Sequence, residues 1–254
     1  MSNIYKTSEV ARIVGVHVNT VRLYEELELI PTVNRLPNGY RILTDYHIDQ
    51  FNLARTAFKV EVLQNGLRKK MINIVKLSAK GKFKEAISET NDYIKQISQE
   101  RKKAEEAIDL SKNILLGIES KENEILLTRK QAAEYLEVTI DTLRNWEMNG
   151  LFTAKRKKNG YRVYTDNDIN ILKIIRTLRC ANYSLSSILR MLNAITKNKD
   201  IDIKAVINKP EENEEIVTAC DKLLTSLKDA EINAKVMLGQ LENMESKFNI
   251  NSTF

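Results

Sequence analysis

The side chains of this sequence that could do chemistry are hydrogen-bonding and charged groups rather than nucleophiles. Two sets of polar residues stand at matching places, each near the start of a predicted helix. They are His17, Asn19, Thr20 and Arg22 in the first set, and Thr139, Asp141, Thr142 and Arg144 in the second. Short polar side chains can hydrogen-bond base edges or phosphates, and arginine can do either. The chemistry on offer is therefore recognition through hydrogen bonds and charge.

The patterns that catalysis needs are missing from the sequence. It contains no glycine-rich phosphate loop, no metal-ligand constellation and no nucleophile–base arrangement. The only cysteines, Cys180 and Cys220, have no disulfide or zinc spacing, and His17 has no second metal ligand in view. We expect no enzyme activity, no metal and no cofactor. No apolar run approaches the roughly 20 residues of a membrane span, so a cytoplasmic, nucleoid-associated protein without a membrane partner is expected.

Charge alternates along the chain in four blocks. Residues 1–83 carry a net charge of +6, residues 84–124 carry −3, residues 125–210 carry +8 and residues 211–254 carry −5. Basic blocks of this size are expected where a protein meets nucleic acid. The acidic blocks would be repelled by phosphate and should point away from it.

Short helices and hairpins must position the polar sets. A helix beginning near Glu9, a Gly15-Val16 turn and a second helix from Val18 to Glu25 form a helix-turn-helix pattern. A β-hairpin with Asn-Gly in its turn is predicted over residues 35–43, followed by a helix capped by Thr44-Asp45 and another over 62–77. The hairpin is thus a wing after a helix-turn-helix.

The pattern repeats further along the chain. A shift of 122 residues superimposes Ala11, Val16, Thr20, Arg22, Glu25 and Leu29 on Ala133, Val138, Thr142, Arg144, Glu147 and Leu151. After one deletion in the hairpin, residues 38–41 match residues 159–162, and Thr44-Asp45 matches Thr165-Asp166. We call residues 1–124 the first repeat and residues 125–248 the second repeat. An internal repeat of this kind indicates two copies of one structural module.

Each repeat ends in a predicted long helix. The first, Lys84–Glu122, would extend over about 55–60 Å at ~1.5 Å per residue. Its seam is Ile94, Ile97, Arg101, Ala104, Ile108, Ser111, Leu115 and Ile118, in which Arg101 and Ser111 are expected to set the register. The second, Glu211–Phe248, has the seam Ile216, Cys220, Leu223, Leu227, Ala230, Ala234, Met237, Leu241, Met244 and Phe248. Spacings of three and four residues indicate helices that pair with one another.

These residues resemble the MerR family of bacterial transcription regulators. The resemblance rests on the arginine–aromatic–glutamate cluster of each second helix and on the Asn-Gly-Tyr-Arg hairpins, and it covers about seventy residues in each repeat. It implies a mainly α fold with two winged helix-turn-helix domains, each followed by a long helix, the two helices pairing as an antiparallel coiled coil. The implied boundaries are 1–83, 84–124, 125–209 and 210–248, with a tail at 249–254.

The resemblance also implies that the second helix of each repeat enters the major groove of double-stranded DNA. The implied DNA-binding residues are His17, Asn19, Thr20, Arg22, Tyr24, Arg35, Tyr40, Arg41, Thr139, Thr142, Arg144, Trp146, Arg156, Lys157, Lys158, Tyr161 and Arg162. Among them, Tyr24 and Trp146 should pack under the hairpins, and the hairpin residues, with Lys155, should mostly meet phosphate. The alternative is that Arg22, Arg144 and the lysines from Lys155 to Lys158 only face solvent.

Two functions fit this organisation. The first is a sequence-specific transcription regulator that acts as a single-chain pseudo-dimer on an imperfect palindrome, with RNA polymerase as an indirect partner. A homodimer formed through the long helices is the alternative assembly. Family members that sense metals or drugs carry cysteines or a domain after the long helix, and we expect neither mode here. The second function is a DNA-organising or partition protein of a phage or plasmid that binds repeated sites.

Overall fold

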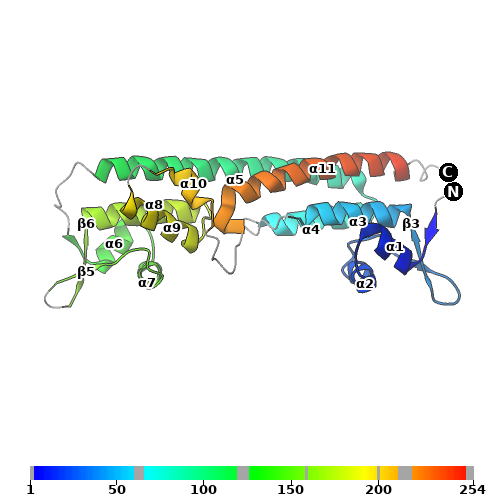
Figure 1. Cartoon of the computed structure of the whole chain (residues 1–254), viewed down its shortest axis with the longest axis horizontal. Helices are drawn as coiled ribbons and strands as arrows, with labels where there is room; N and C mark the ends of the chain where they lie inside the picture. The colour runs from blue at the N-terminus through cyan, green and yellow to red at the C-terminus, as the bar shows by residue number, and fades with distance from the viewer. Residues whose placement is uncertain are drawn as a thin grey trace. The chain divides into compact units, whose positions relative to one another are not determined.

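The computed structural model describes residues 3–59, 66–118, 126–157, 160–198, 201–210 and 219–249, and these are mainly helical (Figure 1). The chain divides into two compact units. Unit 1 comprises Met1–Ser98 together with Leu227–Phe254, and unit 2 comprises Gln99–Ser226. Among the described helices, none is long and apolar enough to cross a membrane.

The predicted pair of short helices opens unit 1. Helices α1 (Thr7–Val14) and α2 (Val18–Glu26) are joined at Gly15, which has φ of +67°. This left-handed conformation suits glycine, because a Cβ atom strains it. The apolar sides of the two helices bury Val10, Val14 and Val21 in one core. The chain can therefore turn sharply between α1 and α2 while both helices share that core.

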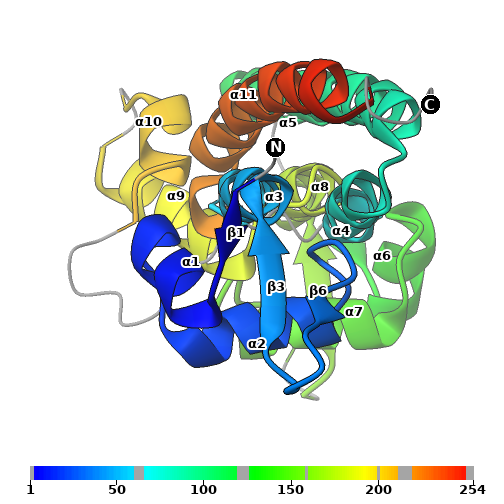
Figure 2. The same ribbon diagram turned by 90° about the vertical axis from the view of Figure 1, so that its right-hand side faces the viewer.

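The predicted hairpin follows α2. Strand β2 (Asn34–Arg35) pairs antiparallel with β3 (Arg41–Thr44), and Gly39 in the turn has φ of +83°. An unpredicted strand, β1 (Ile4–Tyr5), pairs with the other edge of β3, as Figure 2 shows. A strand of two residues is too short to show an alternating pattern, so β1 could not be predicted. The central strand β3 places Leu43 in the core.

Two further helices support the α1–α2 pair. Helix α3 (Asp45–Ala57) packs against α4 (Leu67–Ala79). Gln50, which is fully buried on α3, donates hydrogen bonds to the carbonyls of Leu29 (2.9 Å) and Val75 (2.8 Å). It also accepts one from the Ser78 hydroxyl at 2.7 Å. One buried amide thus fastens the segment after α2 to both α3 and α4, which is favourable only because its bonds are satisfied.

Unit 2 repeats these elements. They are β4 (Leu126–Leu127), α6 (Arg129–Tyr135), α7 (Ile140–Met148), β5 (Lys155–Arg156), β6 (Arg162–Thr165), α8 (Asp166–Cys180) and α9 (Leu185–Lys197). Its sheet has the order β4-β6-β5, matching β1-β3-β2 in unit 1. A short helix, α10 (Ile203–Ile207), follows α9 and has no counterpart among the described elements of unit 1.

The long helix α5 (Phe83–Ile118) begins one residue before its predicted start, and residues 119–122 of the prediction lie outside the described residues. Among its described side chains, the buried ones are Phe83, Ala86, Thr90, Tyr93, Ile97, Glu100, Ala104, Ala107, Ile108 and Ser111. The predicted seam was therefore wrong at Ile94 and Arg101, where Tyr93 and Glu100 are buried instead. Leu115 of the predicted seam is only partly buried, and the side chain of Ile118 lies outside the described part of the chain. Tyr93 and Glu100 continue the spacing set by Thr90, Ile97 and Ala104, whereas Ile94 and Arg101 lie one residue off that stripe.

The second long helix, α11 (Leu223–Asn249), starts later than predicted. A short 3₁₀-helix, Ala219–Lys222, precedes it and contains Cys220, while residues 211–218 lie outside the described residues. The cause of the later start is local, because the Cys220 carbonyl accepts hydrogen bonds from the Ser184 amide and the Ser187 hydroxyl of unit 2. From Leu223 to Met244 the predicted seam is confirmed, since all seven of its residues are buried.

The boundary between the two units falls within both long helices, at Ser98 in α5 and at Ser226 in α11. Within unit 1, α11 approaches α3 of the first repeat. Lys247 forms an ion pair with Asp49 at 2.7 Å, and the rings of Phe248 and Tyr46 lie 4.8 Å apart. The hydrogen bond to Asp49 raises the pKa of Lys247. The second long helix therefore forms part of the compact unit that contains the first repeat's short helices.

The N-termini of α3 and α8 carry the same capping box with different residues. His47 Nδ1 accepts from the Thr44 amide at 3.1 Å, and at the matching place Asp168 accepts from the Thr165 amide at 2.8 Å. Burial is the main cause of a lowered pKa for His47, and its side chain is only 5% exposed. A buried imidazole whose pKa is lowered favours the neutral ring in the folded protein.

We predict that unit 1 loses stability as the pH falls below the ordinary histidine pKa of 6.5, because the unfolded chain then binds a proton that folded His47 resists. The loss ends once the pH has passed through the lower folded-state value. Urea unfolding followed by NMR signals of unit 1, at about pH 7.5 and about pH 5.5, measures it. The His47→Asp variant copies the box of unit 2 and should remove most of the loss. An equal pH dependence in both proteins would contradict the prediction.

Candidate nucleic-acid interface

We call α2 and α7, which were predicted to enter the major groove, the reading helices. A capping residue fixes the N-terminus of each. His17 is the N-cap of α2, and its Nδ1 accepts a hydrogen bond from the Asn19 amide at 3.2 Å. Thr139 is the N-cap of α7, and its hydroxyl oxygen accepts from the Thr142 amide at 3.0 Å. The Thr142 hydroxyl lies 2.8 Å from that of Thr139. His17 and Thr139 therefore start the helices, since a capped helix end satisfies donors that would otherwise lack partners.

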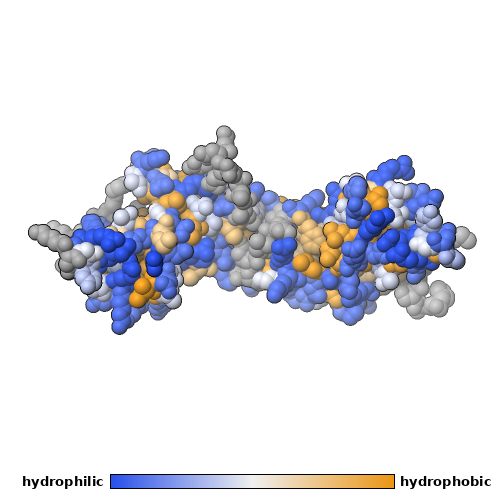
Figure 3. Space-filling model, turned by 90° about the horizontal axis from the view of Figure 1, so that it is seen from below, coloured by the Kyte–Doolittle hydropathy of each residue, from blue (hydrophilic) through white to orange (hydrophobic). Residues whose placement is uncertain are grey.

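The polar side chains after the caps face outwards. Asn19 and Arg22 on α2 are exposed, as are Asp141 and Arg144 on α7, while Thr20 and Thr142 are partly exposed. Both arginines occupy the same place in their repeats and lie in the first or second turn of their helices. The structure thus leaves these groups available for a ligand in each unit. In Figure 3, hydrophilic surface predominates over unit 2, at the left, with small hydrophobic areas within it.

An arginine–glutamate pair joins each hairpin to its helix. Arg41 Nε of β3 donates to Glu25 on α2 at 2.6 Å, and Arg162 Nε of β6 donates to Glu147 on α7 at 2.9 Å. The hydrogen bond with Glu147 raises the pKa of the Arg162 guanidinium. The four side chains are between 17% and 26% exposed. Arg41 and Arg162 thus connect the hairpins to their helices, and the predicted contact of both residues with phosphate stays a prediction.

A second arginine supports each pair. Arg35 lies 3.7 Å from Glu25, and Arg129 at the start of α6 lies 3.5 Å from Glu147. Arg35 also donates to the Gly39 carbonyl at 3.4 Å, as Arg156 does to the Gly160 carbonyl at 3.3 Å. The hairpin turns are therefore braced by arginines that begin the turn, at equivalent positions in both repeats.

The tips of the hairpins carry exposed aromatic and basic groups. Tyr40 is 67% exposed and Tyr161 is 73% exposed. Lys155, Arg156 and Lys157 are exposed on the second hairpin, whereas Lys158 lies outside the described residues. A shallow groove of about 410 Å³ runs beside this hairpin and is lined in part by Arg129, Lys157 and Tyr161. A groove with this lining offers cations and hydrogen-bond donors to an anionic backbone.

Two aromatic residues of the predicted set pack inwards: Tyr24 is partly buried against the core of unit 1, and Trp146 is buried in unit 2. Tyr24 stacks on Phe51 with ring centroids 4.8 Å apart and planes 19° apart, and burial raises its pKa. Trp146 is only 4% exposed. Aromatic rings packed in this way help to fix a helix on its support. The predicted packing of both rings under the hairpins and their contact with DNA stay predictions.

Helix α8 adds basic groups that the sequence analysis missed. A surface hollow of about 580 Å³ beside α7 is lined by Thr139, Thr142 and Asn145 together with Arg176 and Arg179. Arg176 pairs with Glu137 at 2.5 Å, and Arg179 donates to the Tyr183 carbonyl at 2.6 Å. The signal was available, since Lys173, Arg176 and Arg179 recur every three residues along one predicted helix. Among the residues that the structure describes, no group of three or more metal-ligating side chains comes together.

Two family models match separate parts of the chain. Residues 127–195 match a family described as MerR HTH family regulatory protein, and residues 6–42 match one described as MerR family regulatory protein. Each match includes the pair of short helices and both members of the arginine–glutamate pair, which are Glu25 with Arg41 and Glu147 with Arg162. The second match also includes the whole hairpin, whereas the first ends within it. The two matched segments begin at equivalent places, but the second match continues beyond the hairpin through α8 and most of α9.

Three curated relatives are similar over shorter stretches. The HTH-type transcriptional repressor CarH of Myxococcus xanthus is 30% identical over 73 residues, which is 28% of this chain and 24% of the relative. The HTH-type transcriptional regulator ZntR of Escherichia coli (strain K12) is 38% identical over 64 residues, 25% of this chain and 45% of the relative. CueR, an HTH-type transcriptional regulator of Escherichia coli O157:H7, is 40% identical over 53 residues, 21% of this chain and 39% of the relative. The chain spans less than half the length of each, and no solved structure matches it.

We predict that Glu147→Gln loosens the second hairpin, because the neutral amide weakens the ion pairs with Arg162 and Arg129. A partly exposed ion pair contributes about 0.2–1 kcal/mol to stability. The Lys157 amide donates to the Tyr161 carbonyl at 2.9 Å within this hairpin. Its hydrogen-exchange rate should therefore rise by up to about fivefold in the variant. Hydrogen exchange followed by NMR measures this rate.

The matched control for this prediction is Glu134→Gln, which removes an exposed pair with Lys130 on α6. It should leave the Lys157 amide unchanged. Equal exchange rates in the wild-type protein and Glu147→Gln would show that the ion pair does not hold the hairpin.

Proposed function

Two tandem segments of this chain belong to the MerR family of regulatory proteins, and from this premise we propose that the chain is a sequence-specific regulator of transcription that binds double-stranded DNA. Regulators of this kind place a helix in the major groove and make most of their other contacts with phosphates. The single observation that carries the proposal is the repeated arrangement of an exposed arginine on a capped helix, tethered by a glutamate to a basic hairpin.

The proposed contacts follow from exposure. Asn19, Arg22, Thr142 and Arg144 would meet base edges or nearby phosphates, because they project from α2 and α7 beyond the caps. Tyr40, Tyr161, Arg156 and Lys157 would contact the backbone from the hairpins. We leave out Tyr24, Trp146, Arg41 and Arg162, whose side chains are used within the fold.

We further propose that the two repeats act as a single-chain pseudo-dimer, with α5 and α11 pairing as an antiparallel coiled coil. The support is that each compact unit takes parts from both repeats. The C-terminal end of α11, in the second repeat, contacts α3 of the first repeat through Lys247 and Asp49. In the same way Glu105 on α5, in the first repeat, contacts Lys204 on α10 of the second repeat. Buried stripes on both long helices also fit such a pairing.

Unequal half-sites are part of this proposal. The first reading helix offers an imidazole and an amide at His17 and Asn19, whereas the second offers a hydroxyl and a carboxylate at Thr139 and Asp141. A carboxylate accepts hydrogen bonds and is repelled by phosphate, while an amide can both donate and accept. Two heads with different chemistry should prefer different bases, so the proposed operator is an imperfect palindrome.

We predict that Arg22→Ala and Arg144→Ala each weaken binding to an operator selected from random DNA by about tenfold or more, since a base contact is worth roughly 1–3 kcal/mol. Fluorescence anisotropy at fixed salt measures the dissociation constants. Lys228→Ala, which removes an exposed cation from α11, is the control and should change affinity little. Failure of selection to yield any preferred sequence would overturn sequence-specific binding.

We predict that the protein is a monomer of 29.2 kDa at low concentration and binds one operator duplex per chain. Light scattering gives the mass of the free protein and of the complex. A stable dimer that presents four reading helices would overturn the single-chain pseudo-dimer while leaving DNA binding intact.

A further inference from the structure

The second repeat contains an insertion that the first repeat lacks. In the first repeat only three residues separate α4, which ends at Ala79, from α5, which begins at Phe83. In the second repeat α9 ends at Lys197 and α11 begins at Leu223. The described part of this insertion, residues 201–210, contains α10 and packs against α9.

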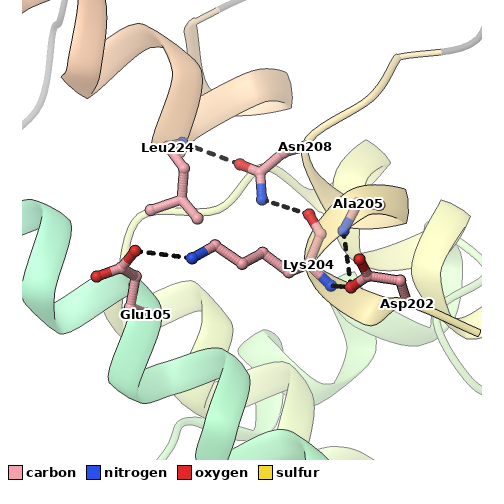
Figure 4. A network of polar contacts seen from close by, with 6 residues as sticks. All are labelled: Glu105, Asp202, Lys204, Ala205, Asn208 and Leu224. Atoms are coloured by element: carbon pink, nitrogen blue, oxygen red, sulfur yellow. Dashed lines mark hydrogen bonds and ion pairs between the residues drawn. The ribbon is translucent and has the colours of Figure 1, made fainter.

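Helix α10 is fastened at both ends, as Figure 4 shows. Asp202 caps it by accepting from the amides of Lys204 (3.0 Å) and Ala205 (3.2 Å). Lys204 reaches Glu105 of α5 at 2.8 Å, and Asn208 accepts from the Leu224 amide of α11 at 2.9 Å. A helix of five residues is not stable by itself, so its position depends on these contacts. Helix α10 thus connects α9, against which it packs, with Glu105 of α5 and Leu224 of α11.

A pocket of about 290 Å³ lies between α9 and α10, entirely within unit 2. Its apolar lining comes from Ala194, Ala205 and Val206. Arg190, which is 9% exposed, donates to the Val206 carbonyl at 3.1 Å and to the Ile207 carbonyl at 3.3 Å, and so fixes the α10 side of the pocket. One buried, hydrogen-bonded arginine thus holds the α10 side of the pocket, while Asn193, Lys197, Ala205 and Lys209 line it as exposed residues.

The remaining lining is positively charged. Lys197 and Lys209 line the pocket, and Asn193 adds an amide that can donate and accept. No acidic side chain belongs to the described lining, and neither lysine forms an ion pair with a residue that the structure describes. Two ammonium groups beside an apolar floor suit a molecule with one anionic end and one apolar body.

We propose that this pocket binds a small organic carboxylate with an apolar body, and that the bound molecule ties α9 to α10. The carboxylate would accept hydrogen bonds from Lys197 and Lys209, because charge-assisted bonds of this kind are stronger than neutral ones. The apolar body would cover Ala194, Ala205 and Val206. Inorganic phosphate lacks the apolar part, and a neutral apolar molecule leaves the ammonium groups without a counter-charge. The proposal does not depend on the DNA-binding function.

Benzoate is the probe that tests the proposal, with the full-length protein and without DNA. Titration followed by ¹⁵N NMR should shift the amide signals of Ala194 and Ala205 in a saturable manner. Benzyl alcohol, which has the same ring without the charge, and inorganic phosphate should each produce much smaller shifts at equal concentration. Phosphate binding as strong as benzoate binding would overturn the choice of an organic anion, and the absence of saturable shifts with benzoate would overturn the site.

Matched lysine variants separate the pocket from general charge effects. The double variant Lys197→Gln/Lys209→Gln should weaken benzoate binding about fivefold or more. The control Lys84→Gln/Lys228→Gln removes the same charge from exposed positions on α5 and α11 and should bind benzoate like the wild-type protein. Equal weakening in both double variants would show that benzoate responds to net charge alone and would overturn the proposal. DNA affinity measured on the same variants tests the proposed function independently.

Discussion

The candidate interface depends on the ion pair between an arginine of the hairpin and a glutamate of the reading helix. A two-stranded hairpin of two and four residues is not stable in isolation. Arg41 and Glu25, and equally Arg162 and Glu147, connect that hairpin to a helix whose other side is buried in the core. The pairs are partly exposed, so each adds little to the overall stability. Their effect is geometric, because they set how far the hairpin tip stands from the exposed face of α2 or α7.

A comparison of the two repeats shows that the turns around the reading helices keep their backbone conformation while their residue types differ. The turn between the two short helices has glycine in the first repeat, whereas Glu137 occupies the matching place with φ of +49° in the second. At the turn after the reading helix the residues are exchanged, with Glu28 at φ of +57° and Gly150 at +74°. The backbone conformation is thus retained while its strain is distributed differently. The same backbone hydrogen bond closes both turns, since the Val16 amide donates to the Ala11 carbonyl at 2.9 Å and the Val138 amide to the Ala133 carbonyl at 3.0 Å.

Much of the fold could be predicted because it rests on local signals. The Asn-Gly turn, the Thr-Asp helix starts and the repeat all identify elements that the structure contains. The edge strands β1 and β4 could not be predicted, since two residues carry no periodicity and their pairing with β3 and β6 is non-local. The site was harder for the same reason. A sequence shows that Arg41 and Arg162 are basic, but only the fold shows that a glutamate sixteen or fifteen positions away already binds each one.

The long helices show how a pattern can be right while its register is wrong. The stripe through Tyr93 and Glu100 and the stripe through Ile94 and Arg101 both have spacings of three and four, so periodicity alone does not choose between them. Polar residues in the stripe do not choose either. Thr90 and Ser111 bond the carbonyls of Ala86 and Ala107 in their own helix, each at 2.7 Å, and so need no partner on another helix. The buried face also carries side chains of different size, with alanines at 86, 104 and 107 beside the larger Tyr93, Ile97 and Ile108. Because buried surfaces pack closely, whatever covers this face has to match that uneven shape, and a periodic pattern in the sequence does not record it.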